Sequence, residues 1–323
     1  MILHERWFLD ESKFPVQFDT WSSPESLIPI AIAVGVTAIA TIIYRSRGRH
    51  SVVPGPLHLG MPWENYVRLL SWVPLVIGVH MGVSLLVSGV NRQLLLPNLV
   101  LPVNLLGGVL GMIEIAIALS FIYGALTRPA AAVLAFIWLV GALIFGPLRL
   151  IEHTEILGVA FFLFVTTRGP LAFDMAVDKL NKPWAPLVPY AVPVLRIALG
   201  VGLCVVAFTE KIWNLPMGLA FLADHNFNFF PYIGLPQIDN TKFLLLAGTI
   251  ELLVGLMLIA GTYVRLVILI TLIPFNLTLP FMGWRELVGH LPTYGILALL
   301  LLWGDERPGE QGALVRALRG GKA

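Results

Sequence analysis

Two glutamates lie inside stretches of sequence that are otherwise apolar. Glu251 lies in TIELLVGLMLIAGTYVR and Glu114 in GMIEIAIALSFIYGALTR, and each precedes an arginine by 14 residues. A carboxylate at the centre of a bilayer costs on the order of 2.5–3.5 kcal/mol, so it is kept only when paired, protonated or used. One interpretation is proton exchange, or hydrogen bonding to a polar head group in a lipid-filled cleft. The other is a structural pin that locks a helix bundle through Glu–His or Glu–Arg bonds.

Further polar residues follow the two glutamates at matching intervals, and we expect the second half to hold the working site. There, Pro274 and Pro280 are expected to break a helix and free backbone carbonyls. We expect catalytic roles for Glu251 and His290. The residues expected to bind a substrate are Lys211, Glu210, Arg285, Tyr294 and Asn276. The first-repeat counterparts, for which the structural pin is favoured, are Glu114, His153, Arg92 and Arg149.

The composition identifies the environment of these residues. Of the 323 residues, 57% are hydrophobic and only 12% are charged, and the mean hydropathy is +0.84. A soluble domain of this size needs a more highly charged surface, so the chain is expected to be an all-α polytopic membrane protein. The net charge of +2, spread over loops, gives no basic patch for nucleic acid.

A helix that spans the bilayer needs about 20 mostly apolar residues, and nine segments are expected to be such helices. The arginines of YRSRGRH follow the first segment and place that loop inside, with the N-terminus outside and the C-terminus in the cytoplasm. The nine segments are 27–44, 72–90, 104–125, 129–147, 152–167, 190–209, 243–262, 264–283 and 287–303.

The chain contains an internal repeat. Residues 108–165 align without a gap to residues 245–302, at an offset of 137. Upstream, an offset of 119 pairs Pro74 with Pro193 and Arg92 with Lys211. The difference is an insertion rich in phenylalanine, expected at the outer membrane interface. Each repeat has four helices, an even number, so the halves are expected to be parallel.

The expected organisation has six parts. An extracytoplasmic tail precedes an N-terminal transmembrane anchor with its inner loop, and two repeats flank an inner linker before a cytoplasmic tail. The outer tail is 1–26, the anchor with its loop is 27–71 and the first repeat is 72–168. The linker is 169–189, the second repeat is 190–304 and the cytoplasmic tail is 305–323.

Cofactor signatures are scarce in the sequence. The only cysteine, Cys204, excludes an internal disulfide, a CxxC pair and a covalent haem attachment. His80 could ligate a haem with His153 or His290, but a lone histidine bonded to a carbonyl is the favoured interpretation. Asp224 and His225 are too sparse to indicate a metal site.

Arg128 and Arg265 are interpreted as snorkelling anchors at the inner membrane edge.

The second half resembles the DoxX/DoxD family of small four-helix bacterial membrane proteins. The segments that carry the resemblance are VPVLRIALGVGLCVVAFTEKIWNLP, GTIELLVGLMLIAGTYVRLVILI and LVGHLPTYGILALLLLWG. The matching residues are Lys211, Pro216, Glu251, Arg265 and His290, with Arg92, Pro97, Glu114, Arg128 and His153 in the first half. The resemblance covers residues 72–303 and implies a tandem pair of such units, in a respiratory or sulfur-oxidising assembly of a bacterial cytoplasmic membrane.

The leading hypothesis is a membrane subunit that interacts with quinone near the outer half of the bilayer. Electrons would come from a partner subunit, since the sequence shows no complete catalytic site and no covalently bound cofactor. Two alternatives from other classes are a non-catalytic anchor or assembly subunit and a transporter of small solutes or lipids. Besides the bilayer, the expected partners are a quinone or other apolar small molecule and further subunits of the complex.

Overall fold

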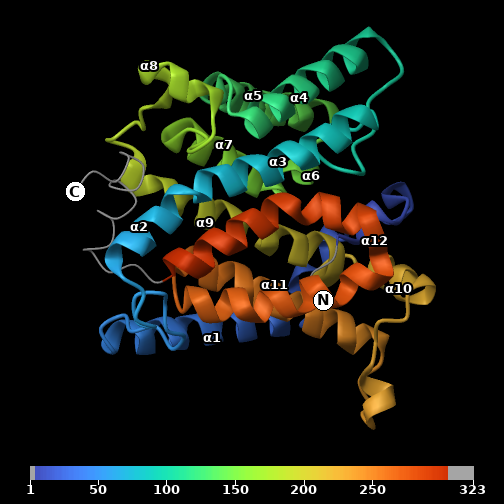
Figure 1. The fold of residues 1–323 in the computed structure, drawn as a ribbon. Helices are drawn as coiled ribbons and strands as arrows, with labels where there is room; N and C mark the ends of the chain where they lie inside the picture. Colours follow the sequence, from blue (N-terminus) through green and yellow to red (C-terminus); the bar gives the residue numbers. More distant parts are fainter. Residues whose placement is uncertain (1–3, 305–323) are drawn as a thin grey trace.

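The computed structural model describes residues 4–304, and the predicted cytoplasmic tail lies outside them. This part of the chain is helical and contains no strand (Figure 1). Seven of its helices are long and apolar enough to cross a membrane. The protein is thus an all-α polytopic membrane protein. The helices that form the bundle are α1 (Pro24–Ser46), α2 (Trp63–Ser71), α3 (Val73–Val90), α4 (Leu105–Tyr123), α5 (Thr127–Phe145), α7 (Thr154–Thr166), α9 (Val188–Val206), α11 (Asn240–Ala260) and α12 (Val264–Trp303).

Shorter elements close the two ends of the bundle. One end, which we call the cluster end, carries the N-terminal turns, α6, α10 and a long loop before α11 (Figure 1). The opposite end carries α2, α8 and the last described residues. The short elements are η1 (Glu5–Trp7), η2 (Glu11–Lys13), η3 (Phe18–Ser22), α6 (Pro147–Ile151), η4 (Phe173–Ala176), α8 (Asp178–Asn181), the π-helix η5 (Ala207–Ile212), α10 (Leu215–Asp224) and η6 (Phe230–Ile233).

The nine predicted segments are all helical, but two features reduce the number of long helices to seven. Helix α7 has only 13 residues, and the last two segments are joined in α12. Gly283 interrupts α12 with φ 68° and ψ −150°, a conformation that favours glycine. The prediction that Pro274 and Pro280 break this helix is wrong, because the chain stays helical through both.

The chain folds back at Gly283, so that the two ends of α12 meet. Arg265 at its start donates hydrogen bonds to the carbonyls of Leu301, Leu302 and Trp303 at its end. Its side chain is buried, with only 5% of the residue exposed. Arg128 makes the corresponding bond in the first half, from Nε to the Phe164 carbonyl at 2.8 Å. Both arginines therefore satisfy carbonyls at helix ends. The burial of Arg265 contradicts its interpretation as a snorkelling anchor, whereas for the half-buried Arg128 that interpretation stays a prediction.

Backbone conformations recur at the interval of 137 residues. Gly124 and Gly261 end α4 and α11 in the left-handed conformation, with φ 67° and 65°. Two residues later, Leu126 and Tyr263 have φ 55° and 48°. Unlike glycine, these side chains disfavour such angles, so their recurrence reflects two connections of the same shape.

Close helix contacts follow the same correspondence. Gly82 of α3 lies against Ala118 and Ile122 of α4, and Gly200 of α9 lies against Gly255 and Ile259 of α11. Between the halves, α7 packs on α9 and α12 packs on α3. Gly158 and Gly295 make these two contacts, the first against Leu195 and the second against Ile77.

The first helix of the second half contains one residue more than the first helix of the first half. The contact glycines Gly82 and Gly200 are 118 residues apart, whereas Arg92 and Lys211 are 119 apart. The π-helix η5 lies between these positions in the second half. A π-helix accommodates one extra residue in a helix, which accounts for the shift. The packing of these helices before η5 follows an offset of 118, so the predicted pairing of Pro74 with Pro193, at an offset of 119, is shifted by one residue.

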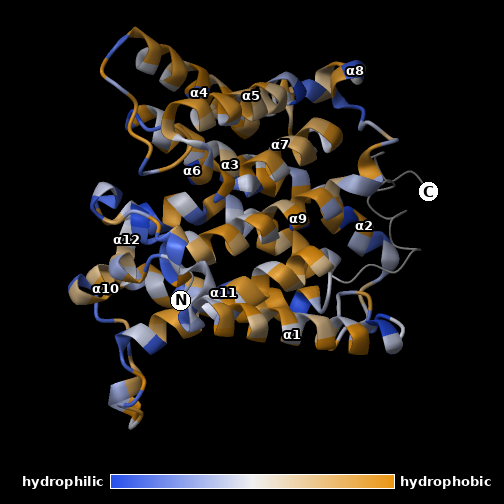
Figure 2. Cartoon of the chain, turned by 180° about the vertical axis from the view of Figure 1, so that it is seen from behind, coloured by the Kyte–Doolittle hydropathy of each residue, from blue (hydrophilic) through white to orange (hydrophobic). Residues whose placement is uncertain are grey.

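Helix α1 belongs to neither half and covers α11. Ala33 of α1 packs with Leu252, and the Thr41 hydroxyl lies 2.9 Å from the Thr262 hydroxyl. On α4, the surface corresponding to the covered part of α11 is exposed, with Met112 68% exposed. Apolar residues cover the outward faces of α1, α4 and α5, while hydrophilic residues gather at the two ends of the bundle (Figure 2).

Candidate functional site

The N-terminal segment enters the bundle and forms part of the candidate site. Trp7 is 3% exposed and Glu5 is fully buried. The Glu5 backbone N–H donates to Glu210 Oε2 at 2.6 Å. Farther along, Gln17 N–H donates to the Trp213 carbonyl at 2.8 Å. Residues 4–7 are thus buried in the bundle and Gln17 contacts it again, although much of 8–23 is exposed. The interpretation of residues 1–26 as an outer tail had missed these contacts.

Buried polar side chains from the segment and from both halves meet at the cluster end. The histidines at equivalent positions of the two halves, His153 and His290, both face His4. Their ring centroids lie 4.6 and 5.3 Å from the His4 ring. We call this assembly the central cluster and define it as His4, Glu5, Arg6, Trp7, Glu152, His153, Glu155, Glu210, Lys211, Glu251, Glu286 and His290.

Each half supplies its histidine with a carboxylate. His153 Nδ1 lies 3.0 Å from Glu155 Oε1, and His290 Nδ1 lies 3.2 Å from Glu286 Oε1. The carboxylates come from different places, two residues after His153 and four residues before His290. The imidazole–carboxylate pair is thus present twice even though the acid is not at a repeated position.

The π-helix η5 brings two charged residues into the cluster. Lys211 Nζ lies 3.0 Å from Glu251 Oε2, and both side chains are fully buried. Glu210 Oε1 lies 3.4 Å from His4 Nδ1. Because a π-helix has more residues per turn, successive side chains leave it in altered directions, and both neighbours face the interior here.

Ion pairs connect the cluster to the protein surface. Arg6 lies 3.1 Å from Glu152 and 3.5 Å from Glu11. Glu11 in turn lies 3.0 Å from Arg149, whose side chain is 36% exposed. On the second-half side, Arg285 donates to the Trp7 carbonyl at 2.7 Å. A continuous set of charged groups therefore leads from solvent to the buried interior.

Carboxyl groups outnumber cations in the central cluster. Its glutamates are all buried, and only Arg6 and Lys211 are permanently charged partners. Burial raises the pKa of Glu5 to about 8, with Lys211 opposing the shift. Burial, followed by the nearby His153, lowers the pKa of His4 to about 3. At neutral pH, Glu5 is thus mostly protonated and His4 is neutral, so the cluster holds exchangeable protons.

Several buried polar atoms have no hydrogen-bond partner among residues 4–304. They include Glu286 Oε2, His290 Nε2, the Tyr294 hydroxyl and both carboxyl oxygens of Glu5. The Phe275 ring lies close to two of these residues, with its centroid 4.6 Å from that of the His290 ring and 5.8 Å from that of the Tyr294 ring. Buried polar groups are normally satisfied, so this region offers donors and acceptors to water or a ligand.

The structure brings most of the predicted site residues together. Glu251, His290, Lys211, Glu210 and His153 belong to the central cluster. Arg149 and Arg285 lie at its rim, and Tyr294 lies beside it.

Three predicted residues lie elsewhere. Asn276 is exposed and donates to the Leu272 carbonyl of its own helix, because its side chain points away from the bundle. Arg92 is exposed in the loop after α3. Glu114 is buried, but it accepts the Leu95 backbone N–H at 2.8 Å instead of joining the cluster.

Sequence analysis had missed the cluster members of the N-terminal segment and the glutamates that lie close to the histidines. Glu286 could have been identified, because a residue four positions before His290 on a helix faces the same side. Glu152 directly precedes His153, and Glu155 follows it by two residues. The burial of residues 4–7 had no comparable signal, since a short charged segment before a membrane helix is typical of solvent-exposed tails.

The other histidine of interest, His80, lies apart from the cluster contacts. Its Nδ1 lies 2.7 Å from the Val76 carbonyl of the same helix, which confirms the interpretation of a lone histidine bonded to a carbonyl. Among residues 4–304, no group of three His, Cys, Asp or Glu side chains is arranged to hold a metal ion.

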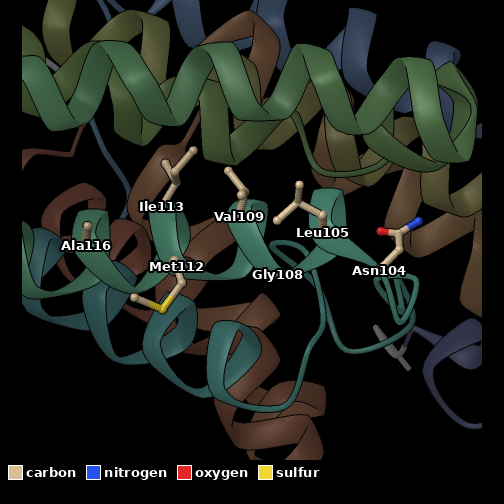
Figure 3. A pocket seen from close by; sticks show the side chains of 7 residues that line it. All are labelled: Asn104, Leu105, Gly108, Val109, Met112, Ile113 and Ala116. Atoms are coloured by element: carbon tan, nitrogen blue, oxygen red, sulfur yellow. The ribbon is translucent and has the colours of Figure 1, made fainter.

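An open apolar groove runs along α4 (Figure 3). It has a volume of about 640 Å³, and Met112, Val109 and Leu105 extend from the helix along it. The groove contains none of the predicted site residues. In a bilayer, such an apolar surface is accessible to acyl chains.

Comparisons with known proteins identify no relative. No protein-family model matches the chain, and neither the curated proteins nor the solved structures include a match.

Proposed function

We propose that the protein is the quinone-interacting membrane subunit of an oxidoreductase complex. In this proposal, two parallel four-helix units of the DoxX kind, together with α1, make nine spans in a bacterial cytoplasmic membrane. The N-terminus and the central cluster face outward. Electrons pass to or from a partner subunit, while this chain binds the quinone and exchanges its protons.

The observation that carries the proposal is the central cluster, a buried acid–base network at one end of the bundle. Quinone reduction consumes two electrons and two protons for each molecule, and quinol oxidation releases them. A site for this chemistry needs hydrogen-bonding groups for the two ring oxygens and carboxyl or imidazole groups that accept or donate protons. The cluster provides both types of group at one end of an apolar helix bundle.

Particular residues suit particular roles in this proposal. His290 Nε2 and the Tyr294 hydroxyl are buried groups without a partner among the described residues, and they could bond a ring oxygen. Glu286 supports the His290 ring from its Nδ1 side. Lys211 Nζ lies 3.0 Å from Glu251 Oε2 and holds this carboxyl in place.

The proposal is tested with the full chain in lipid nanodiscs and a matched pair of variants. Glu251→Gln and Glu114→Gln each change one buried carboxyl, but only the first belongs to the cluster. We expect Glu251→Gln to weaken the binding of a short-chain ubiquinone by about tenfold, the equivalent of about 1.4 kcal/mol, and Glu114→Gln to leave it unchanged. Equal binding by wild type and both variants would contradict the proposal.

A structural subunit is the second candidate, and the Lys211–Glu251 pair favours it. An ion pair with both side chains fully buried is suited to pinning helices together. This function predicts that Glu251→Gln lowers the yield of folded protein and changes no quinone affinity. Measuring the yield by size-exclusion chromatography in the same preparations separates the two functions.

A further inference from the structure

The N-terminal segment fills a space between the two halves with aromatic rings. The Trp7 ring stacks on His4 at 4.4 Å. It also lies 4.8 Å from His290 and 6.1 Å from His153. The ring therefore occupies a slot lined by one histidine from each half.

Gly289 makes room for the indole in this slot. A Cβ atom at Gly289 would lie 2.3 Å from two Trp7 ring carbons, closer than any side chain tolerates. The equivalent residue in the first half is Glu152, which reaches Arg6 instead. The second half thus presents a flat space of aromatic size next to His290.

The segment pairs with the first-half side of the slot, through Arg6 and Glu152, but it leaves polar groups beside His290 unsatisfied. His290 Nε2 and Glu286 Oε2 find no partner among residues 4–304. An element retained only to close the bundle would be expected to bond to these groups, since a buried polar group without a partner destabilises the fold. A ring with oxygen atoms at its edge would reach them.

The attachment of the segment is local. Its short 3-10 turns, η1 and η2, are joined to the bundle by individual bonds: Glu5 N–H to Glu210, Arg6 to Glu152, Arg285 to the Trp7 carbonyl and Arg149 to Glu11. The segment precedes α1 and lies outside both halves of the chain. It could therefore leave while every bundle helix stays in place.

We propose that residues 4–13 are a displaceable occupant of a binding slot between His153 and His290, and that a planar quinone ring takes the place of Trp7 when the segment leaves. This inference rests on the proposed function and adds the position of the ring and its competitor. Binding of the ring and docking of the segment exclude one another.

The test measures binding of a short-chain ubiquinone to the full chain in nanodiscs. Trp7→Ala is expected to tighten binding about tenfold, the change for a slot that is occupied by its own segment about nine-tenths of the time. Trp7→Phe, with a smaller ring, should give an intermediate gain. Gly289→Ala should also tighten binding, because the added methyl group expels the indole but fills little of the space.

A reversible lock and a matched glycine control complete the design. In a Cys204→Ser background, Glu11→Cys and Arg149→Cys replace the ion pair at the rim, and a disulfide-containing bifunctional reagent joins them. The linked protein should lose quinone binding, and reduction should restore it. Gly108→Ala, at a helix position with no atom within 4 Å of the new Cβ, should leave affinity unchanged.

The outcomes separate the inference from the function on which it rests. If ubiquinone binds with equal affinity to wild type, Trp7→Ala, Gly289→Ala and the linked protein, the slot inference is wrong and the proposed function stands. If neither wild type nor Trp7→Ala binds ubiquinone while both remain folded, the proposed function is wrong, and the slot has no such ligand.

Discussion

The two halves keep the same buried glutamate in different environments. Glu251 lies 3.0 Å from the Lys211 ammonium and belongs to the central cluster. Glu114, 137 residues earlier, accepts a single backbone N–H, from Leu95. The residue that matches Lys211 is Arg92, which is exposed. A repeated carboxyl therefore becomes part of an acid–base site only where a cation is turned inward.

The inward turn of the cation coincides with the π-helix η5. The first helix of the first half, α3, ends at Val90 without such an interruption, and Arg92 follows in the loop with φ 57°. In the second half, the additional residue continues the helix through Ile212. Lys211 then stays within the bundle instead of reaching the surface. A change of one residue in helix register thus accounts for much of the difference between the halves.

The largest effect is expected when the buried cation, Lys211, is removed. Lys211→Met leaves Glu251 and the neighbouring Glu210 buried without their ammonium partner. Breaking a buried pair in this way costs about 3–5 kcal/mol, so we expect the free energy of unfolding to fall by that amount in a reversible SDS titration. The double variant Lys211→Met/Glu251→Leu should recover most of the loss.

A surface lysine of the same half serves as the control. Lys242 pairs with Asp239 at 3.6 Å, but both side chains are about 60% exposed. Lys242→Met should change the free energy of unfolding by at most about 1 kcal/mol. If the two lysine variants lose the same stability, the Lys211 pair is not special and the comparison fails.

The pH dependence of segment docking distinguishes the site from the rest of the bundle. The folded pKa of Glu5 is raised from 4.5 to about 8, so its contribution to docking falls as pH rises between these values. The folded pKa of His4 is lowered from 6.5 to about 3, so its contribution falls as pH drops across that range. Docking should be nearly constant between pH 4.5 and 6.5 and weaken on both sides.

Amide hydrogen exchange of residues 4–13 measures this docking directly. Between pH 6.5 and 8, the free energy of docking should fall by roughly 2 kcal/mol. Glu5→Gln should remove the decline on the alkaline side, and His4→Gln the decline on the acid side. Exchange protection that stays constant from pH 4 to 9, after correction for intrinsic rates, would refute the assignment of these groups.

The paired arginines at the opposite end give a smaller, graded effect. Arg265 is buried and satisfies three carbonyls, so Arg265→Gln should cost about 1.5–3 kcal/mol. Arg128 is only half-buried, and one of its two bonds, to the Lys182 carbonyl, is exposed. Arg128→Gln should therefore cost less in the same SDS titration. The reverse order would show that exposure does not decide the strength of these contacts.

The smallest effect is expected at the two glycine contacts between the halves. A Cβ at Gly158 would lie 2.8 Å from the Ala198 Cβ, whereas a Cβ at Gly295 would come no closer than 3.4 Å to α3. Gly158→Ala should lower the midpoint of thermal unfolding, with a cost of about 1–3 kcal/mol. Gly295→Ala should be neutral or stabilise by up to about 1 kcal/mol, from the gain in helix propensity. Equal losses in both variants would contradict the difference in packing.

Most of the helix positions could be predicted because long apolar segments in a membrane have little alternative to helix. The exceptions are features that the local sequence does not determine. Pro274 and Pro280 suggested the break in α12, but the fold placed it at Gly283, which alone leaves the helical conformation. The sequence identified Glu251 as a buried polar residue and the structure places it in the cluster, but its catalytic role stays a prediction. The prediction for Asn276 failed because a polar residue in an apolar helix does not reveal which way it points.

By itself, the sequence determined the membrane class, the approximate helices and the repeated polar residues, since these follow from apolar length, charge cost and spacing along one chain. Only the tertiary structure decided which of those residues meet. The contacts of His4 with His153 and His290 join three distant parts of the chain. They depend on the helix register at η5, on the space left by Gly289 and on the path of the N-terminal segment, which are properties of packing rather than of local composition.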